Sequence, residues 1–116
     1  MLFDLRTYTC RPGTVRQHLA LYEKHGFAVQ KRHLGEPVIY GITETGPQNS
    51  YVHIWLYRDA ADRAARRAAM EADPEWASYR KISAEAGLLV SQENRLLTQA
   101  PFFDAAQAAA ALRNGA

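Results

Sequence analysis

A chain of 116 residues has the size of one domain and leaves no room for a second. Its hydrophobic content of 47% and charged content of 22% are ordinary for a globular protein. The formal net charge is only +2 and acidic residues are interleaved with basic ones, which argues against the concentrated basic surface of a nucleic-acid-binding protein.

The N-terminal third predicts a strand followed by a helix. Residues 2–10 read as a strand, because branched and aromatic side chains alternate with polar ones until the turn signal at residues 11–13. Thr14 is a candidate N-cap, and apolar residues then recur at spacings of three and four, which predicts a helix to about residue 34. Gly26 lies within that apolar stripe at a cost of about 1 kcal/mol relative to alanine, so it indicates close packing, a kink or a local break.

The middle of the chain predicts a hairpin and a second helix. Strands are expected at residues 37–45 and 51–58, joined by the turn signal at residues 46–49. Asp59 then resembles an N-cap. The helix that follows carries a stripe of small side chains, Ala61, Ala64, Ala65, Ala68 and Ala72. We expect this stripe to lie against the sheet and the arginines Arg63, Arg66 and Arg67 to form the solvated side.

The C-terminal third predicts one more helix and a last strand. Asp73 and Pro74 form a helix start, and Gly87 is a natural stop. Residues 88–98 read as the fourth strand. We expect the domain to span residues 1–103 and the alanine-rich tail, residues 104–116, to form a short helix or to fray.

With the two consecutive helices after Asp59 counted as one helical unit, the order of elements is β-α-β-β-α-β, which predicts an α+β, ferredoxin-like fold with a four-stranded antiparallel sheet. Right-handed crossovers place the helices on one side of the sheet, so the other face is bare in a single subunit. Alternate residues of a strand point to opposite faces, which separates the aliphatic residues of the third strand from its aromatic ones. We expect the bare face to be the one that carries Trp55 and several tyrosines, and to be covered by a second copy in a barrel-like homodimer.

Several short segments of the chain are distinctive. They are residues 4–9 (DLRTYT) and 11–13 (RPG), 22–26 (YEKHG), 46–49 (GPQN) leading into 52–55 (VHIW), 72–76 (ADPEW) and 96–98 (LLT). In this order they resemble the NIPSNAP family. The resemblance covers roughly residues 2–103. It implies a dimeric α/β barrel, a superfamily that includes cofactor-free monooxygenases of antibiotic biosynthesis, muconolactone isomerases and haem-binding chlorite dismutases. One fold hosts many functions, so the resemblance implies no particular reaction. Haem stays open by that analogy alone, and we expect no cofactor.

The residues that could carry chemistry lie on the predicted strands. His53 is a candidate general base or ligand hydrogen-bonding group, or else a core histidine whose nitrogens are satisfied by neighbours. Arg6 could bind an anionic group of a ligand, or could pair with Asp4 or Glu93 to neutralise buried charge. Three rings, Tyr8, Tyr40 and Trp55, could wall an aromatic pocket or form ordinary packing.

Other site types find little support in the sequence. His18 and His25 are seven residues apart, about 10 Å along a helix, which is too far for one zinc ion, so no metal site is expected. Cys10 is the single cysteine, excludes an intrachain disulfide and is expected to be a buried or half-exposed thiol. With no leader-like start and no apolar run long enough for a bilayer, we expect a cytoplasmic protein without membrane insertion.

Two functions from different classes follow. The first is a homodimer that binds a small hydrophobic or aromatic ligand and acts as a cofactor-independent monooxygenase or isomerase on an aromatic or polyketide-like compound. The second is a non-catalytic interaction or scaffold protein, since no unambiguous catalytic group is present. A cavity with converging polar groups favours the first, and an interior filled by side chains favours the second.

Overall fold

The structure is a computed structural model that describes residues 1–104 and 106. Within these residues the chain forms four strands and four helices, in the order β1 (Leu2–Cys10), α1 (Val15–His25), α2 (Phe27–Leu34), β2 (Ile39–Ile42), β3 (Ser50–Tyr57), α3 (Ala60–Glu71), α4 (Pro74–Ala86) and β4 (Leu89–Thr98). No helix of this described part is both long and apolar enough to cross a membrane. Apart from residues 104 and 106, the predicted tail lies outside the described residues.

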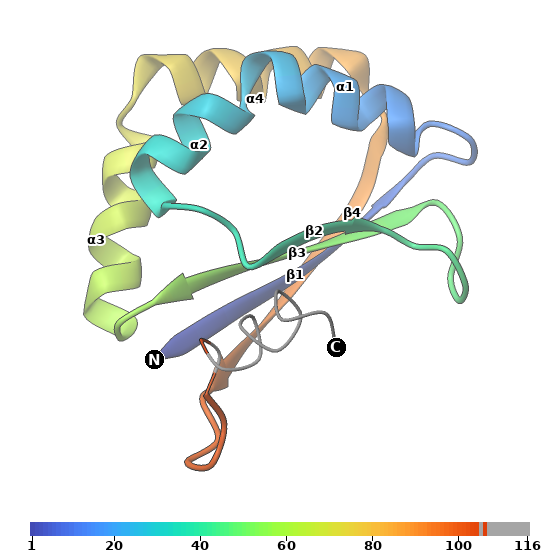
Figure 1. Cartoon of the computed structure of the whole chain (residues 1–116). Coiled ribbons are helices and arrows are strands. Elements are labelled where there is room, and N and C mark those ends of the chain that lie inside the picture. Colours follow the sequence, from blue (N-terminus) through green and yellow to red (C-terminus); the bar gives the residue numbers. More distant parts are fainter. Residues whose placement is uncertain (105, 107–116) are drawn as a thin grey trace.

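The four strands form one antiparallel sheet in the order β2-β3-β1-β4. The first strand is central, and Leu5 lies opposite Ile54 of β3 and Arg95 of β4. All four helices lie on one side of this sheet (Figure 1). The arrangement is the predicted α+β, ferredoxin-like fold, and the predicted fold class is confirmed.

The first predicted helix is divided into α1 and α2 at Gly26. A Cβ atom on Gly26 would lie 2.9 Å from Cγ of Tyr79, closer than real Cβ atoms approach, and 3.0 Å from Cδ1 of Tyr22, a very tight contact. The backbone bends there with φ −121°, although the Gly26 N–H still donates to the Tyr22 carbonyl at 2.7 Å. Gly26 therefore allows both the break between α1 and α2 and the close packing of α4 against it.

The hairpin strand β2 is shorter than the predicted span of residues 37–45. The ladder ends where the N–H of Thr43 donates to the carbonyl of Ser50 at 3.0 Å. The Ser50 hydroxyl donates to the carbonyl of Pro47 at 2.7 Å, which closes the turn from inside. Hydroxyl groups that bond to nearby backbone offer an alternative to strand pairing, so the turn begins early.

The helix α3 presents the opposite face to the sheet from the one predicted. The stripe of alanines is exposed. The side chains of Arg63, Arg66 and Arg67 are half-buried instead, and Met70 is fully buried. The prediction was wrong because the buried carboxylate of Asp4 needs a cation, and Arg63 Nε donates to Asp4 Oδ2 at 3.0 Å. Arginine stems can cover apolar surface while their heads reach such a partner.

Both later helices begin as the sequence predicts. The Asp59 carboxylate accepts a hydrogen bond from the N–H of Asp62 at 2.8 Å, and Asp73 accepts one from the N–H of Glu75 at 2.9 Å. The second of these helices ends at Gly87, whose φ of +64° is the left-handed conformation that glycine adopts without strain.

The two faces of the sheet are covered in the reverse of the predicted way. The aromatic residues of β3 face the helices and are at most 1% exposed; they are Tyr51, His53, Trp55 and Tyr57. The uncovered face is aliphatic and is formed at its centre by Phe3, Leu5, Val52, Ile54 and Leu56. The prediction that Trp55 lies on the bare face was wrong. Strand parity separates two sets of residues but does not say which set the crossover helices cover.

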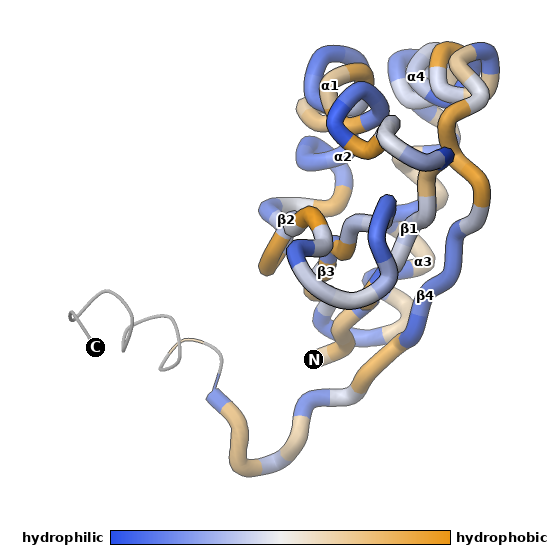
Figure 2. The backbone as a smooth tube through the Cα atoms, turned by 90° about the vertical axis from the view of Figure 1, so that its right-hand side faces the viewer, coloured by the Kyte–Doolittle hydropathy of each residue, from blue (hydrophilic) through white to orange (hydrophobic). Residues whose placement is uncertain are grey.

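Strand β4 forms a polar outer edge of the sheet. Figure 2 shows it beyond β1, hydrophilic through its middle, with α1 and α4 side by side above the sheet. Every residue of β4 after Leu89 is exposed. Charged residues on an exposed edge discourage pairing with further strands, and Glu93 and Arg95 fill this role.

Candidate functional site

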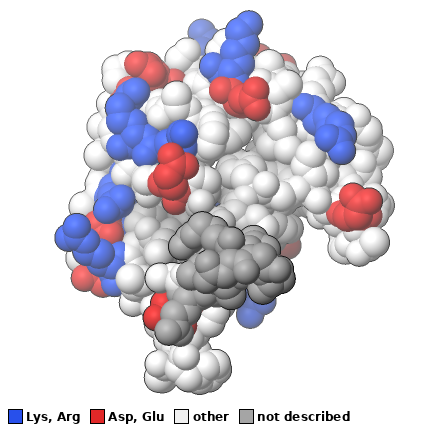
Figure 3. All heavy atoms as spheres, in the orientation of Figure 1, with Lys and Arg blue, Asp and Glu red and all other residues white. Residues whose placement is uncertain are grey.

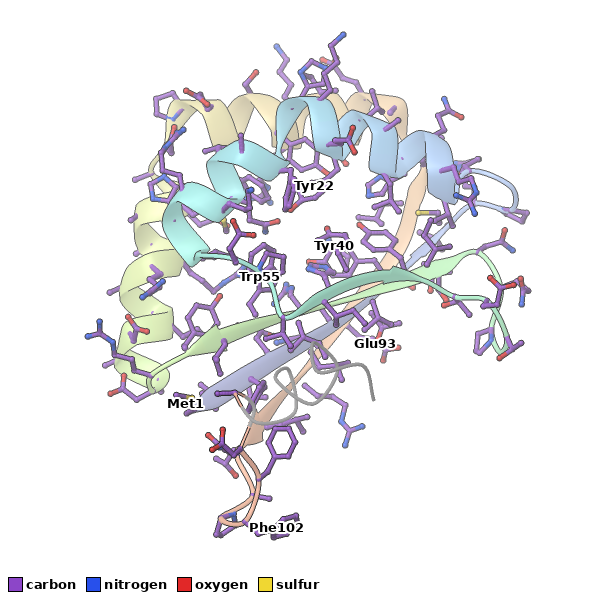
Figure 4. The ribbon with its side chains drawn as sticks, in the orientation of Figure 1. Met1, Tyr22, Tyr40, Trp55, Glu93 and Phe102 are labelled. Atoms are coloured by element: carbon purple, nitrogen blue, oxygen red, sulfur yellow. The ribbon has the colours of Figure 1, made fainter. Side chains whose placement is uncertain are left out.

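A cavity of about 340 Å³ lies between the helix-covered face of the sheet and the helices. Tyr22 below α1 and Tyr40 above β2 lie in this layer (Figure 4). Five tyrosines dominate the cavity wall: Tyr8, Tyr22, Tyr40, Tyr51 and Tyr79. The exposed lining residues Glu71, Arg80 and Gln92 come from α3, α4 and β4, so the cavity opens where these elements meet.

Four of the five site residues named from the sequence line this cavity. They are Arg6, Tyr8, Tyr40 and His53. Trp55 does not line it but lies beneath His53, with 0% of its surface exposed. Because β1, β2 and β3 are neighbours and these side chains share one face, the register brings them together: Arg6 and Tyr40 each lie opposite His53.

The imidazole of His53 is held in one protonation state by Trp55. The indole Nε1–H of Trp55 donates to Nδ1 of His53 at 2.7 Å. An indole nitrogen can only donate, so Nδ1 must be the unprotonated acceptor and the ring proton lies on Nε2. That Nε2 atom is buried and has no hydrogen-bond partner among the described residues.

The surroundings of His53 keep its ring neutral. Burial first, and the charge of Arg6 next, lower its pKa to about 3, against a weaker opposite effect of Asp4. A base with so low a pKa takes up few protons at neutral pH. The geometry therefore suits His53 to donating a hydrogen bond through Nε2–H and not to general-base catalysis.

Beneath the cavity, Asp4 joins three elements through its buried carboxylate. Arg6 of its own strand donates to it at 3.2 Å, Arg63 of α3 at 3.0 Å, and Asn94 of β4 at 3.0 Å. Burial would raise the pKa of Asp4, but the hydrogen bond from Asn94 and the two guanidinium charges outweigh it and lower the pKa. Asp4 thus stays ionised and orients Arg6. Glu93, the other predicted partner, points to the opposite face of the sheet (Figure 4).

Arg6 also binds Tyr8, because its ion pair with Asp4 uses a terminal guanidinium nitrogen and leaves Nε available. Arg6 Nε donates to the Tyr8 hydroxyl at 2.9 Å, so that hydroxyl oxygen accepts and its proton is free to point elsewhere. The Tyr8 ring in turn meets the His53 ring edge-on, with centroids 4.8 Å apart. Arg6, Tyr8 and His53 therefore form one connected polar part of the wall.

The remaining wall is a stack of neutral aromatic rings. Tyr40 stacks on His53 with ring centroids 4.6 Å apart and on Tyr22 at 5.2 Å. Burial raises the pKa of Tyr22, Tyr40 and Tyr51, and raises that of Tyr79 to about 12. At neutral pH these rings are protonated phenols, which present flat faces for an aromatic ligand.

Arg67 and Trp76 are among the residues of the wall that the sequence analysis missed. Arg67, predicted to be solvated, lines the cavity and takes part in no ion pair within residues 1–104 and 106. Its guanidinium lies beside the Tyr57 hydroxyl, where it opposes the burial that raises the pKa of Tyr57. Trp76 lines it too, and its buried Nε1–H has no partner in the described structure. One signal was present: Arg63, Arg67 and Met70 share one helical stripe, and the apolar methionine marks it as the inward face.

Metal-binding geometry does not emerge from these residues. No group of three or more His, Cys, Asp or Glu side chains in the described part of the chain is placed to hold a metal ion. The imidazole of His18 is instead hydrogen-bonded to the Tyr51 hydroxyl at 2.8 Å. Cys10 is buried, and burial raises the pKa of its thiol, which fits the expected structural role.

Comparison with known proteins matches the NIPSNAP family model to residues 3–104. This chain belongs to the NIPSNAP family. A NipSnap homolog of Dictyostelium discoideum is 37% identical over 75 residues, which cover 65% of this chain and 33% of that protein. The chain therefore spans about a third of the length of this curated relative.

Solved NIPSNAP structures have the same fold. A NIPSNAP family protein with unknown function from Agrobacterium tumefaciens is 39% identical, with a TM-score of 0.80 over 89% of this chain and 91% of that one. An uncharacterized NIPSNAP domain protein from Burkholderia xenovorans is 30% identical, with a TM-score of 0.84 over 90% and 99%. More distantly, a variant of SnoaB, a cofactor-independent oxygenase from Streptomyces nogalater, shares the fold at 19% identity, with a TM-score of 0.58 over 88% and 97%.

Proposed function

We propose that this NIPSNAP protein is a homodimer that binds a small aromatic or polyketide-like compound in its cavity and acts on it as a monooxygenase or isomerase without a cofactor. The observation that carries the proposal is the cavity of about 340 Å³, walled by tyrosines and holding the buried, unpartnered Nε2–H of His53. Binding sites for small molecules typically combine apolar walls with a few placed polar groups and start at about 300 Å³. A scaffold protein would have no need to keep this space open.

The chemistry assigned to the cavity is charge stabilisation. A donor fixed in a water-poor site stabilises negative charge that develops on a ligand oxygen, such as that of an enolate. In an isomerisation a C–H bond breaks, its proton passes to solvent water at the cavity mouth and its electron pair forms the enolate, and a proton from water then adds at another carbon atom. In the oxygenation of a methylene group to a ketone, O₂ gives one oxygen atom to the carbon and the other leaves as water with the two methylene hydrogens. The substrate supplies the electrons, so no external reductant is required.

The homodimer is proposed from the bare aliphatic face. Phe3, Leu5 and Ile54 are only half-buried, and Ile39 beside them is 51% exposed. No described helix covers this face, as Figure 1 shows. Single subunits rarely leave large contiguous apolar patches in water, and a two-fold dimer is the commonest way to bury one. The cavity lies on the other side of the sheet, so such a dimer would leave its mouth open.

The ligand-binding proposal is tested by a thermal-shift screen of aromatic and quinone-like metabolites, followed by turnover measurements with any hit. We expect a rise in melting temperature for a subset of flat aromatic compounds. His53→Ala is then expected to reduce affinity or turnover at least tenfold, while His25→Ala, outside the cavity wall, leaves both unchanged. Equal behaviour of the His53→Ala variant and the unaltered protein would remove His53 from the mechanism.

On the face shown in Figure 3, most of the basic side chains lie on the left-hand side, with acidic side chains among them. Nucleic-acid binding requires concentrated positive charge along a surface. This distribution supports a small-molecule ligand over a nucleic acid as the partner.

A further inference from the structure

The cavity wall contains hydrogen-bond donors that have no acceptor. The Nε2–H of His53 and the Nε1–H of Trp76 are buried and unpaired within the described residues, and both side chains line the cavity. Buried donors in folded proteins are almost always paired, since an unpaired one loses its hydrogen bond to water and gains none in return. His53 cannot relieve this by changing its tautomer, because Trp55 occupies Nδ1. The wall is therefore prepared for a ligand that supplies acceptors.

The same wall carries excess positive charge. Its charged members are Arg6, Arg67 and Arg80 against the single acidic side chain of Glu71. Arg80 is paired with Glu71 at 2.9 Å, and Arg6 shares the carboxylate of Asp4. Arg67 is left without an ion pair in the described structure. One guanidinium group without a counter-charge, next to neutral donors, matches one negative charge on a ligand.

We propose that the cavity takes its ligand as an aromatic carboxylate, with the carboxylate on Arg67 and the Nε2–H of His53 and the ring between the tyrosines. This rests on the proposed small-molecule function and narrows its ligand class. A guanidinium group binds the two oxygens of a carboxylate in one plane, which gives both strength and direction. The five tyrosines that line the cavity supply the aromatic surface against which the ring of the ligand packs.

Trp55 is the positioning residue of this site. It does not line the cavity, yet its hydrogen bond to Nδ1 decides that His53 presents a proton and not a lone pair to the ligand. A lone pair at that place would repel a carboxylate. The Trp55 indole therefore acts on ligand choice through His53 alone.

The charge preference is tested with two matched probes, 2-naphthoate and 2-naphthamide, by titration calorimetry at pH 7. We expect naphthoate to bind at least tenfold more tightly than the neutral amide. Arg67→Gln is expected to remove that preference. Arg66→Gln is the control, since Arg66 lies beside Arg67 on α3 but pairs with Asp62 at 2.9 Å outside the cavity.

The outcomes of this titration separate the carboxylate proposal from the proposed small-molecule function. Equal binding of the two probes, or a preference that survives Arg67→Gln, overturns the carboxylate proposal and leaves the small-molecule function standing. If neither probe binds, both the carboxylate proposal and the proposed small-molecule function are overturned.

The tautomer is tested on the unaltered protein by ¹⁵N NMR of the His53 ring. We expect a protonated Nε2 and an unprotonated Nδ1 from pH 7 down to pH 5, and a mixture of tautomers in Trp55→Phe together with weaker naphthoate binding. A protonated Nδ1 in the unaltered protein overturns the proposed site, whether or not the variant folds.

Discussion

The two faces of the sheet are made by the same strands but differ in what covers them. On one face, Asp4, Arg6 and His53 lie beneath the helices among tyrosines, and their polar groups are joined by defined hydrogen bonds. On the other face, Leu5 and Ile54 lie in an aliphatic surface that no described element covers. Polar groups are thus concentrated on the face that the helices cover, and the other face is apolar. This difference is the basis of the two proposed roles, ligand binding on the covered face and self-association on the uncovered one.

The largest expected effect concerns the aliphatic face. Ile54→Lys places a charge at its centre, and a charge without a partner in a buried interface costs several kcal/mol. We expect the proposed dimer to become a monomer, measured as a halved mass in sedimentation equilibrium. Ala64→Lys adds the same charge on the exposed side of α3 and should leave the mass unchanged. A monomeric unaltered protein at micromolar concentration would contradict the assignment of this face to a partner.

The next effect concerns the buried carboxylate of the covered face. Asp4→Asn leaves Arg6 and Arg63 close together without their shared anion, so we expect unfolding free energy to fall by about 3–5 kcal/mol. Glu93→Gln, on the other face and exposed, should change it by less than about 0.5 kcal/mol. Urea unfolding followed by circular dichroism measures both. Similar losses in the two variants would show that the faces do not differ in this way.

The protonation of His53 gives a pH dependence that the aliphatic face cannot give. The folded pKa of about 3 lies below the ordinary value of 6.5, so the unfolded chain takes up a proton first as the pH falls. Stability is therefore complete above pH 6.5 and is lost progressively toward pH 3. At pH 5 we expect His53 to account for a loss of about 2 kcal/mol relative to pH 7.

The His53→Gln variant isolates this contribution, because its stability should lack that part of the slope between pH 7 and pH 5. Asp4 does not interfere in this window, since its pKa is lowered and it stays ionised. An unchanged slope in His53→Gln would mean that the ring is not held neutral by its surroundings.

The smallest expected effect concerns packing density, which two glycine substitutions compare. Gly26 lies in the helical layer over the covered face, and Gly41 lies in the sheet strand β2. Gly26→Ala forces a methyl group against the rings of Tyr79 and Tyr22, and we expect a loss of about 1–2 kcal/mol. Gly41→Ala in β2 meets only the Ile39 side chain at 3.9 Å, an ordinary contact, so it should change stability little. Thermal melting of both variants gives the difference. A destabilisation confined to Gly41→Ala would reverse the expected order of packing density.

Much of the fold could be predicted because it depends on local signals. The alternation in residues 2–10, the caps at Asp59 and Asp73 and the stop at Gly87 all act within a few residues of where they stand. Their order then leaves few ways to connect the strands. The glycine within the apolar stripe, Gly26, also predicted a local break and close packing, and the structure has both, because only a residue without Cβ fits there.

The sequence by itself determined the strands, the helical segments, their order and the family, and it singled out Arg6, Tyr8, Tyr40 and His53 as candidates. The register of the folded sheet is what places these four side chains on one cavity. Only the tertiary structure decided which face of the sheet the helices cover and which face of α3 turns inward. Both choices depend on contacts between residues far apart in the chain, above all the need of the buried Asp4 for Arg63, 59 residues away. From the local pattern alone, the alanine stripe of α3 is the expected packing face. Leaving the buried carboxylate of Asp4 without a cation would cost more free energy than packing that stripe would gain, so the arginine side of α3 turns inward.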